Sequence, residues 1–116
     1  MNINPSLIGL GLFFAIAQAP VFAAVVPGHD GSATEGRAFA IQACGACHAV
    51  IPGQRPRNPP VAAAPDFKAV ANAKTTSAIG LHAFLVTPHQ TMPNIILSDD
   101  AREDVIAYIL SLRSKK

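Results

Sequence analysis

Both cysteines of this chain lie in one pentapeptide, Cys44-Gly45-Ala46-Cys47-His48, which has the form C-x-x-C-H. On a helix, residues three and four apart share a face, so the two thiols and the imidazole would leave the backbone on the same side. Thiols placed in this way can bond one edge of a porphyrin while the imidazole binds its iron, and C-x-x-C-H is the attachment sequence for c-type haem. The motif therefore predicts one covalent haem c, with iron bound by His48.

Three other uses of the motif have to be compared with this one. A thiol redox site favours alternating strands and helices, and the chain has little strand pattern. A structural zinc site needs four ligands, and no second pair follows at a finger-like spacing. The further candidates are His29, His82 and His89. A disulfide between Cys44 and Cys47 would close too short a loop to stabilise much.

The amino-terminal segment has the character of a secretory leader. Residues 1–28 contain no Asp, Glu, Lys, Arg or His, and residues 7–17 are almost wholly apolar. Small residues before the predicted cut favour cleavage after Ala23, which would leave residues 24–116 as one domain. No Lys or Arg precedes the apolar run, so an uncut membrane anchor is the alternative. Export also suits haem attachment, and we expect a periplasmic protein.

Beyond the leader, the pattern predicts several short helices. A capping box at residues 32–35 opens a helix that runs to the cysteines, and five prolines between residues 51 and 65 favour an extended loop that can wrap the haem edge. Short helices are expected over residues 66–73 and 77–86. A last helix, capped by Ser98, has inward-facing positions at helical spacing. These positions are Ala101, Val105, Tyr108, Ile109 and Leu112.

The second iron ligand decides what such a haem can do, because an open site binds small molecules and two strong ligands favour electron transfer. Met92 is the leading candidate, since Met1 would leave with the leader and no other methionine remains. It lies beside Pro93 in a loop between predicted helices. It could instead fill a gap in the core, and His89 is the rival ligand.

The order of these features resembles that of the small class I cytochromes c of bacterial periplasms. Gly36 in the first helix, the C-x-x-C-H motif, the Met92-Pro93 loop and the run at residues 107–109 occur in that family's order. The resemblance implies an all-α fold, with three to five short helices wrapped around one covalent haem. It also implies a close crossing of the first and last helices, to which Gly36 would allow tight approach.

The resemblance further implies that a proline carbonyl accepts a hydrogen bond from the ring N–H of the proximal histidine, and Pro65 is the best match. Pro65 could equally serve only to start the next helix. The chain departs from the family in having Ala40 where an aromatic residue is common, and in lacking tryptophan. Arg55 and Arg57 could face the haem propionates or a docking partner, or simply be solvated.

We therefore expect a one-electron carrier in which His48 and Met92 stay bound to the iron, with redox proteins as electron donor and acceptor. The alternatives are a ligand-binding haem sensor with a labile sixth site, or a cytochrome subunit of a periplasmic redox enzyme. The sequence shows no nucleophile constellation and no phosphate-binding glycine loop, so we do not expect an enzyme or a small-molecule substrate. A formal net charge of +2 gives no indication of nucleic-acid binding, and membrane contact is expected only if the leader is uncut.

Overall fold

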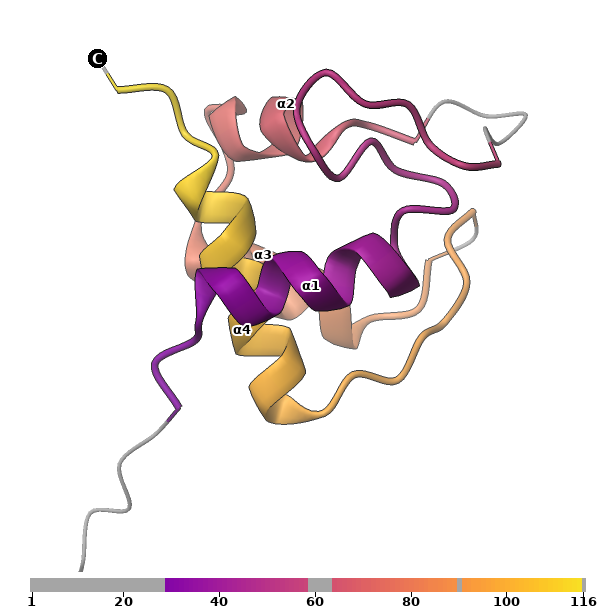
Figure 1. The fold of residues 1–116 in the computed structure, drawn as a ribbon. Helices are drawn as coiled ribbons and strands as arrows, with labels where there is room; N and C mark the ends of the chain where they lie inside the picture. Colours follow the sequence, from indigo (N-terminus) through magenta and orange to yellow (C-terminus); the bar gives the residue numbers. More distant parts are fainter. Residues whose placement is uncertain (1–28, 59–63, 90, 116) are drawn as a thin grey trace, which may run out of the picture.

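A computed structural model describes residues 29–58, 64–89 and 91–115, so the predicted leader lies outside the described residues. Four helices follow one another along this part of the chain, and it contains no strand (Figure 1). They are α1 (Ala33–Ala43), α2 (Phe67–Asn72), α3 (Ala78–Val86) and α4 (Asp99–Ser111). The predicted all-α fold is confirmed, and each helix lies within about two residues of its predicted position.

Each helix begins at a side-chain cap. The four capping residues accept a hydrogen bond from the backbone N–H three residues further on, which satisfies one of the free donors of the first turn. They are Ser32, Asp66, Ser77 and Ser98. A complete capping box at α1 would also have the Glu35 side chain accept a hydrogen bond from the Ser32 N–H. That N–H donates instead to Asp104 Oδ1 of α4 at 2.6 Å, so only half of the predicted capping box is present. The start of the first helix is therefore tied to the last.

Helices α1 and α4 cross one another, as Figure 1 shows, and they come into close contact at Gly36. A Cβ atom added to Gly36 would lie 1.9 Å from the Asp104 carbonyl oxygen and 2.9 Å from the Val105 nitrogen. No side chain fits into this space, so the crossing requires glycine at position 36. The close approach that the family resemblance implied is confirmed.

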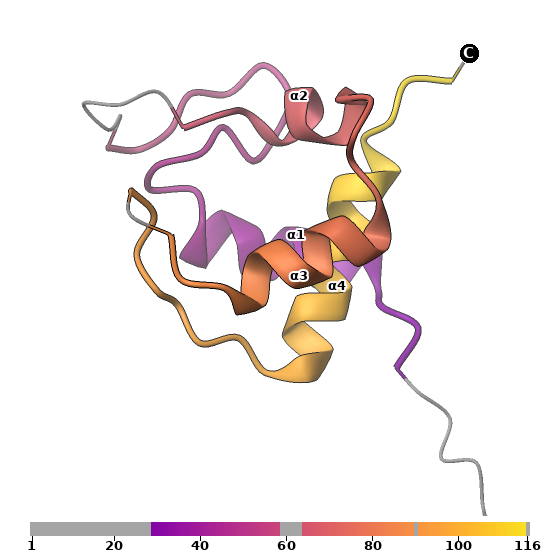
Figure 2. The ribbon, with the colours of Figure 1, turned by 180° about the vertical axis from the view of Figure 1, so that it is seen from behind.

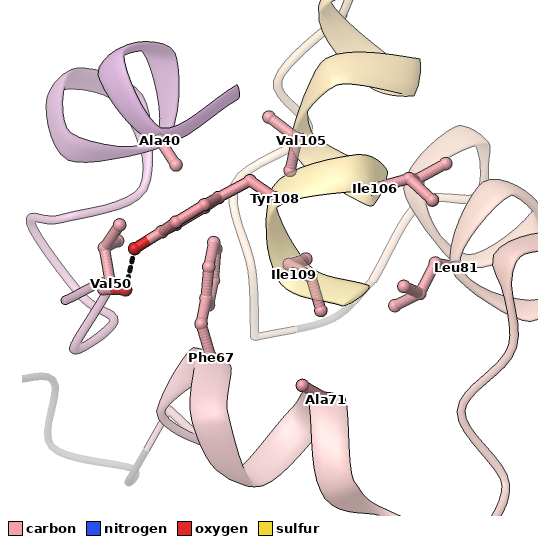
Figure 3. Packing of buried hydrophobic residues seen from close by; sticks show 9 residues of the cluster. All are labelled: Ala40, Val50, Phe67, Ala71, Leu81, Val105, Ile106, Tyr108 and Ile109. Atoms are coloured by element: carbon pink, nitrogen blue, oxygen red, sulfur yellow. Dashed lines mark hydrogen bonds between the residues drawn. The ribbon is translucent and has the colours of Figure 1, made fainter. Parts of the chain in front are cut away.

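The core is small and entirely apolar in the described part of the chain (Figure 3). Helix α4 supplies Val105, Ile106, Tyr108 and Ile109, of which Ile106 was not among the predicted inward positions. The other buried apolar residues are Ala40, Val50, Phe67, Ala71 and Leu81. The Tyr108 hydroxyl donates to the Val50 carbonyl at 2.9 Å, the dashed line in Figure 3, so α4 also holds the segment that follows the cysteine motif.

Arg113, which follows α4, is hydrogen-bonded to α2 and to the segment after it. Arg113 Nε donates to the Ala71 carbonyl at 3.2 Å, and its Nη2 donates to the Thr76 carbonyl at 2.6 Å. The carbonyls at the end of a helix lack partners within the helix, so a cation placed there is stabilising. Arg113 therefore stabilises the end of α2. None of the helices in the described segments is long and apolar enough to span a bilayer.

Candidate haem site

The C-x-x-C-H segment forms a turn that continues directly from α1. Cys44 is the C-terminal capping residue of α1. Its carbonyl accepts hydrogen bonds from the Cys47 N–H at 3.1 Å and the His48 N–H at 3.0 Å. The bond from His48 spans four residues, as in an α-helix. The argument that residues three and four apart share a helix face therefore applies to this turn. Both thiols are free.

Cys44 does not have the lowered pKa of a thiol redox centre. Burial raises the pKa of its thiol to about 11, because a low-dielectric environment penalises the charged thiolate. Thiols that act in redox exchange have lowered pKa values, which populate the nucleophilic thiolate. The thiol redox interpretation therefore finds no support at this site.

The ring of His48 is held by the segment that precedes α2. Its Nδ1 lies 2.7 Å from the Pro65 carbonyl oxygen, and because a carbonyl can only accept, Nδ1 carries the proton in this bond. The backbone N–H of Phe67 donates to the Ala49 carbonyl at 3.0 Å. The first bond fixes the ring, the second holds the backbone on either side of it, and Nε2 is the nitrogen left to bind a metal.

A row of three rings connects His48 to the core. The Phe67 ring centroid lies 5.4 Å from that of His48 and 6.4 Å from that of Tyr108, and both pairs are tilted. Such tilted pairs are favourable arrangements of aromatic rings. The sequence predicts a helix over residues 66–73, which includes Phe67, and it predicts no contact between Phe67 and His48. The position of Phe67 two residues after Pro65 is the signal that it lies beside His48.

Met92 lies half-buried in the segment that joins α3 to α4. In Figures 1 and 2 this segment reaches toward the edge of the molecule where α1 ends. His89, the rival ligand, packs its ring on Phe84 of α3 with the centroids 3.6 Å apart. Several large apolar side chains of α3 and this segment are exposed in the protein chain alone: Ile79, Phe84, Val86, Ile95 and Ile96.

The other histidines have protein partners. His82 Nδ1 lies 2.9 Å from Glu103 Oε1, which joins α3 to α4. His29 Nε2 lies 2.5 Å from Asp104 Oδ1, which joins the start of the described chain to α4. Gly31, at a φ of 75°, turns the chain back onto α4 just after His29. Across the described residues no three His, Cys, Asp or Glu side chains gather to hold a metal, which leaves the zinc interpretation without support.

The pair of His29 and Asp104 predicts a pH-dependent stability. The Asp104 carboxylate raises the pKa of His29 above 6.5, and the Ser32 N–H and His29 lower the pKa of Asp104 below 3.8. The His29 contribution is full below pH 6.5 and is lost as the pH rises through its raised pKa. The Asp104 contribution is present above pH 3.8 and is lost as the pH falls through its lowered pKa.

We therefore expect the His29→Gln variant to be less stable than the wild type, by a small margin, chiefly between pH 3.8 and 6.5. Denaturant unfolding of both proteins across this range measures the difference in the free energy of unfolding. The difference should decline on the alkaline side as His29 loses its proton. A difference that does not change with pH would contradict the assignment.

The side chains present fit a covalently bound haem. The motif offers two free thiols on one turn, and Nε2 of His48 is available because Nδ1 is already hydrogen-bonded. Large apolar side chains of α3 and the Met92 segment are exposed in the protein chain. A porphyrin of this kind supplies a one-electron iron couple and a large apolar surface. Fold and site together define a small helical haem protein.

Comparison with known proteins identifies the family. Residues 33–113 match the Cytochrome c family, which spans all four helices, and the chain therefore belongs to this family. Its cofactor is haem c with iron, and its class is that of haem-based electron carriers. Cytochrome c-552 of Bradyrhizobium diazoefficiens is 36% identical over 106 residues, which cover 90% of this chain and 93% of that protein. No solved structure matches this chain.

Proposed function

We propose that this chain is an exported one-electron carrier, with residues 1–23 as a cleaved leader and residues 24–116 as the cytochrome c domain. Haem c would be bonded to Cys44 and Cys47, with His48 and Met92 as the two iron ligands. The observation that carries the proposal is the 2.7 Å hydrogen bond from His48 Nδ1 to the Pro65 carbonyl. It fixes the tautomer and the ring, and it increases the basicity of the nitrogen that would bind iron.

Met92 is the best available donor for the other side of the iron. Its thioether is half-buried in a segment with Pro93 next to it, and His89 is already packed against Phe84. A thioether is a soft donor that favours ferrous iron, which raises the reduction potential relative to two imidazoles. With both ligands supplied by the protein, the oxidised and reduced states need little rearrangement.

Export and partner choice follow from the same assignment. Haem attachment through thiols is expected outside the cytoplasm, in the bacterial periplasm, and the uncharged residues 1–28 provide the signal. The partners are redox proteins that give and take one electron in brief, small contacts. The cytochrome c-552 of Bradyrhizobium diazoefficiens supports this role as a relative of matching length.

The Met92→Ala variant tests the second ligand. We expect covalent haem to be retained, the weak near-infrared band of sulfur bound to ferric haem to disappear, and the reduction potential to fall. The reduced variant should also bind carbon monoxide, whereas the reduced wild type should not. A wild type that binds carbon monoxide readily would support a ligand-binding sensor in place of a carrier.

The matched control is His89→Ala, which removes the rival ligand from the same segment. This variant should keep the near-infrared band and resist carbon monoxide as the wild type does. If His89 were the sixth ligand, the wild type would lack the sulfur band, and carbon monoxide would bind to reduced His89→Ala and not to reduced Met92→Ala.

A further inference from the structure

The loop after the motif is bonded back onto the cysteine turn through Arg57. The backbone N–H groups of Arg57 and Asn58 donate to the carbonyls of Gly45 and Ala46, at 3.0 and 2.8 Å. Gly45 and Ala46 are the two residues between the cysteines. The loop therefore fixes the part of the motif that sets the spacing of the two thiols.

The Arg57 guanidinium makes a second pair of bonds just before the motif. Its Nη1 donates to the Ile41 carbonyl at 2.6 Å and its Nη2 to the Gln42 carbonyl at 3.0 Å. These carbonyls belong to the last turn of α1, where backbone acceptors lack partners and the helix dipole is negative. A planar guanidinium can bridge two carbonyls at once, which an ammonium group cannot do in the same fixed geometry.

Gly45 provides the space for this arrangement. A Cβ atom at position 45 would lie 2.5 Å from the Ile41 carbonyl oxygen and 3.3 Å from Arg57 Nη1. The first distance is too short for any side chain, and the second would displace the guanidinium. The glycine between the cysteines and the arginine in the loop therefore fit one another.

We propose that Arg57 is a positioning residue for the haem, which locks the Cys44–His48 turn and fixes a positive charge beside it. The inference rests on the proposed haem attachment at this turn. Reduction adds one electron to the haem, so a positive charge held close by favours the reduced form and raises the potential. Arg57 thus acts by holding the Cys44–His48 turn in place and by the electric field of its charge, and it need not touch the iron or its ligands.

Arg55 provides a matched control. It carries the same charge in the same loop, and with Gly45, His48 and Arg57 it lines a shallow hollow beside the motif. Among the described residues its side chain makes no hydrogen bond or ion pair, and it is exposed to solvent. Arg55→Gln and Arg57→Gln each remove one positive charge from this loop, and only Arg57→Gln also removes the two bonds to the end of α1.

The test is the reduction potential of the purified holoproteins, measured by spectroelectrochemistry. We expect Arg57→Gln to lower the potential more than Arg55→Gln, with Arg57→Lys between Arg57→Gln and the wild type because it keeps the charge but not the bridge. Amide exchange at residues 57 and 58 should accelerate in Arg57→Gln and not in Arg55→Gln. Equal shifts of potential in the two glutamine variants would overturn the proposal.

The presence of covalent haem in the wild type and the behaviour of Arg57→Lys distinguish a failure of the Arg57 proposal from a failure of the proposed haem function. A wild type without covalent haem would refute the haem assignment itself, whereas covalent haem with equal shifts would refute only the role of Arg57. If Arg57→Gln yields no holoprotein, Arg57→Lys decides the matter. A wild-type potential together with wild-type amide exchange in Arg57→Lys would overturn the positioning role.

Discussion

The Gly36→Ala variant should lose the close crossing of α1 and α4. The added methyl group would lie 1.9 Å from the Asp104 carbonyl oxygen and 2.3 Å from its carbonyl carbon, and both are backbone atoms that cannot turn aside. The helices must move apart, and forced overpacking of this kind costs about 1–3 kcal/mol or more. The gain in helix propensity from glycine to alanine offsets only ~1 kcal/mol of this cost. Denaturant unfolding of the holoprotein measures the net loss.

Gly80→Ala is the matched control for this substitution. Gly80 lies in α3 and is exposed, and a Cβ atom there would meet only the Ser77 hydroxyl at 3.1 Å and the Thr75 carbonyl oxygen at 3.9 Å. The hydroxyl can shift by a few tenths of an ångström, so this variant should be close to the wild type or slightly more stable. A Gly36→Ala protein as stable as the wild type would show that the two helices do not approach as described.

Removal of the haem should abolish cooperative unfolding. In the double variant Cys44→Ala/Cys47→Ala the protein has no covalent attachment, and its buried core consists of nine residues, two of them alanines, in the part of the chain that the structure describes. Burial stabilises by about 25 cal/mol per Å², so a core this small offsets little of the conformational entropy lost on folding. The porphyrin would supply the missing apolar contact for side chains such as Phe84 and Ile95.

Circular dichroism on heating distinguishes the two proteins. The holoprotein should melt in one sharp transition, and the double variant should show a gradual change without a defined midpoint. The single variant Cys44→Ala, which keeps one thioether link, is the intermediate control. A sharp melt of the haem-free double variant would mean that the protein core is sufficient by itself.

The parts of this fold that depend on neighbouring residues could be predicted from the sequence. Ser32 and Ser98 were predicted to cap helices because a hydroxyl reaches an N–H only three residues away, and the structure shows both bonds. The spacing of Val105, Tyr108 and Ile109 predicted the inner face of α4 for the same local reason. Ile106 lies one position outside that stripe and is buried because α4 contacts α2 and α3 as well as α1.

The contacts that join distant segments could not be predicted in this way. The sequence leaves Arg57 to face the propionates, a docking partner or solvent, because its sequence neighbours do not reveal that the loop folds back onto α1. The bond from Ser32 to Asp104 joins residues 72 positions apart and displaces the predicted reciprocal contact of Glu35. Pro65 was proposed as a partner of His48 only through the family resemblance, and spacing alone left it open.

The position of α4 far behind the cysteine motif in the sequence also bears on the order in which the protein can fold. This helix contributes four of the nine buried apolar side chains and the Tyr108 hydroxyl that secures the Val50 segment. A ribosome delivers the amino-terminal end first, so the thiols emerge well before the residues that close the interior over them. Until α4 packs, the interior beside the thiols is not closed, so haem attachment can precede final folding.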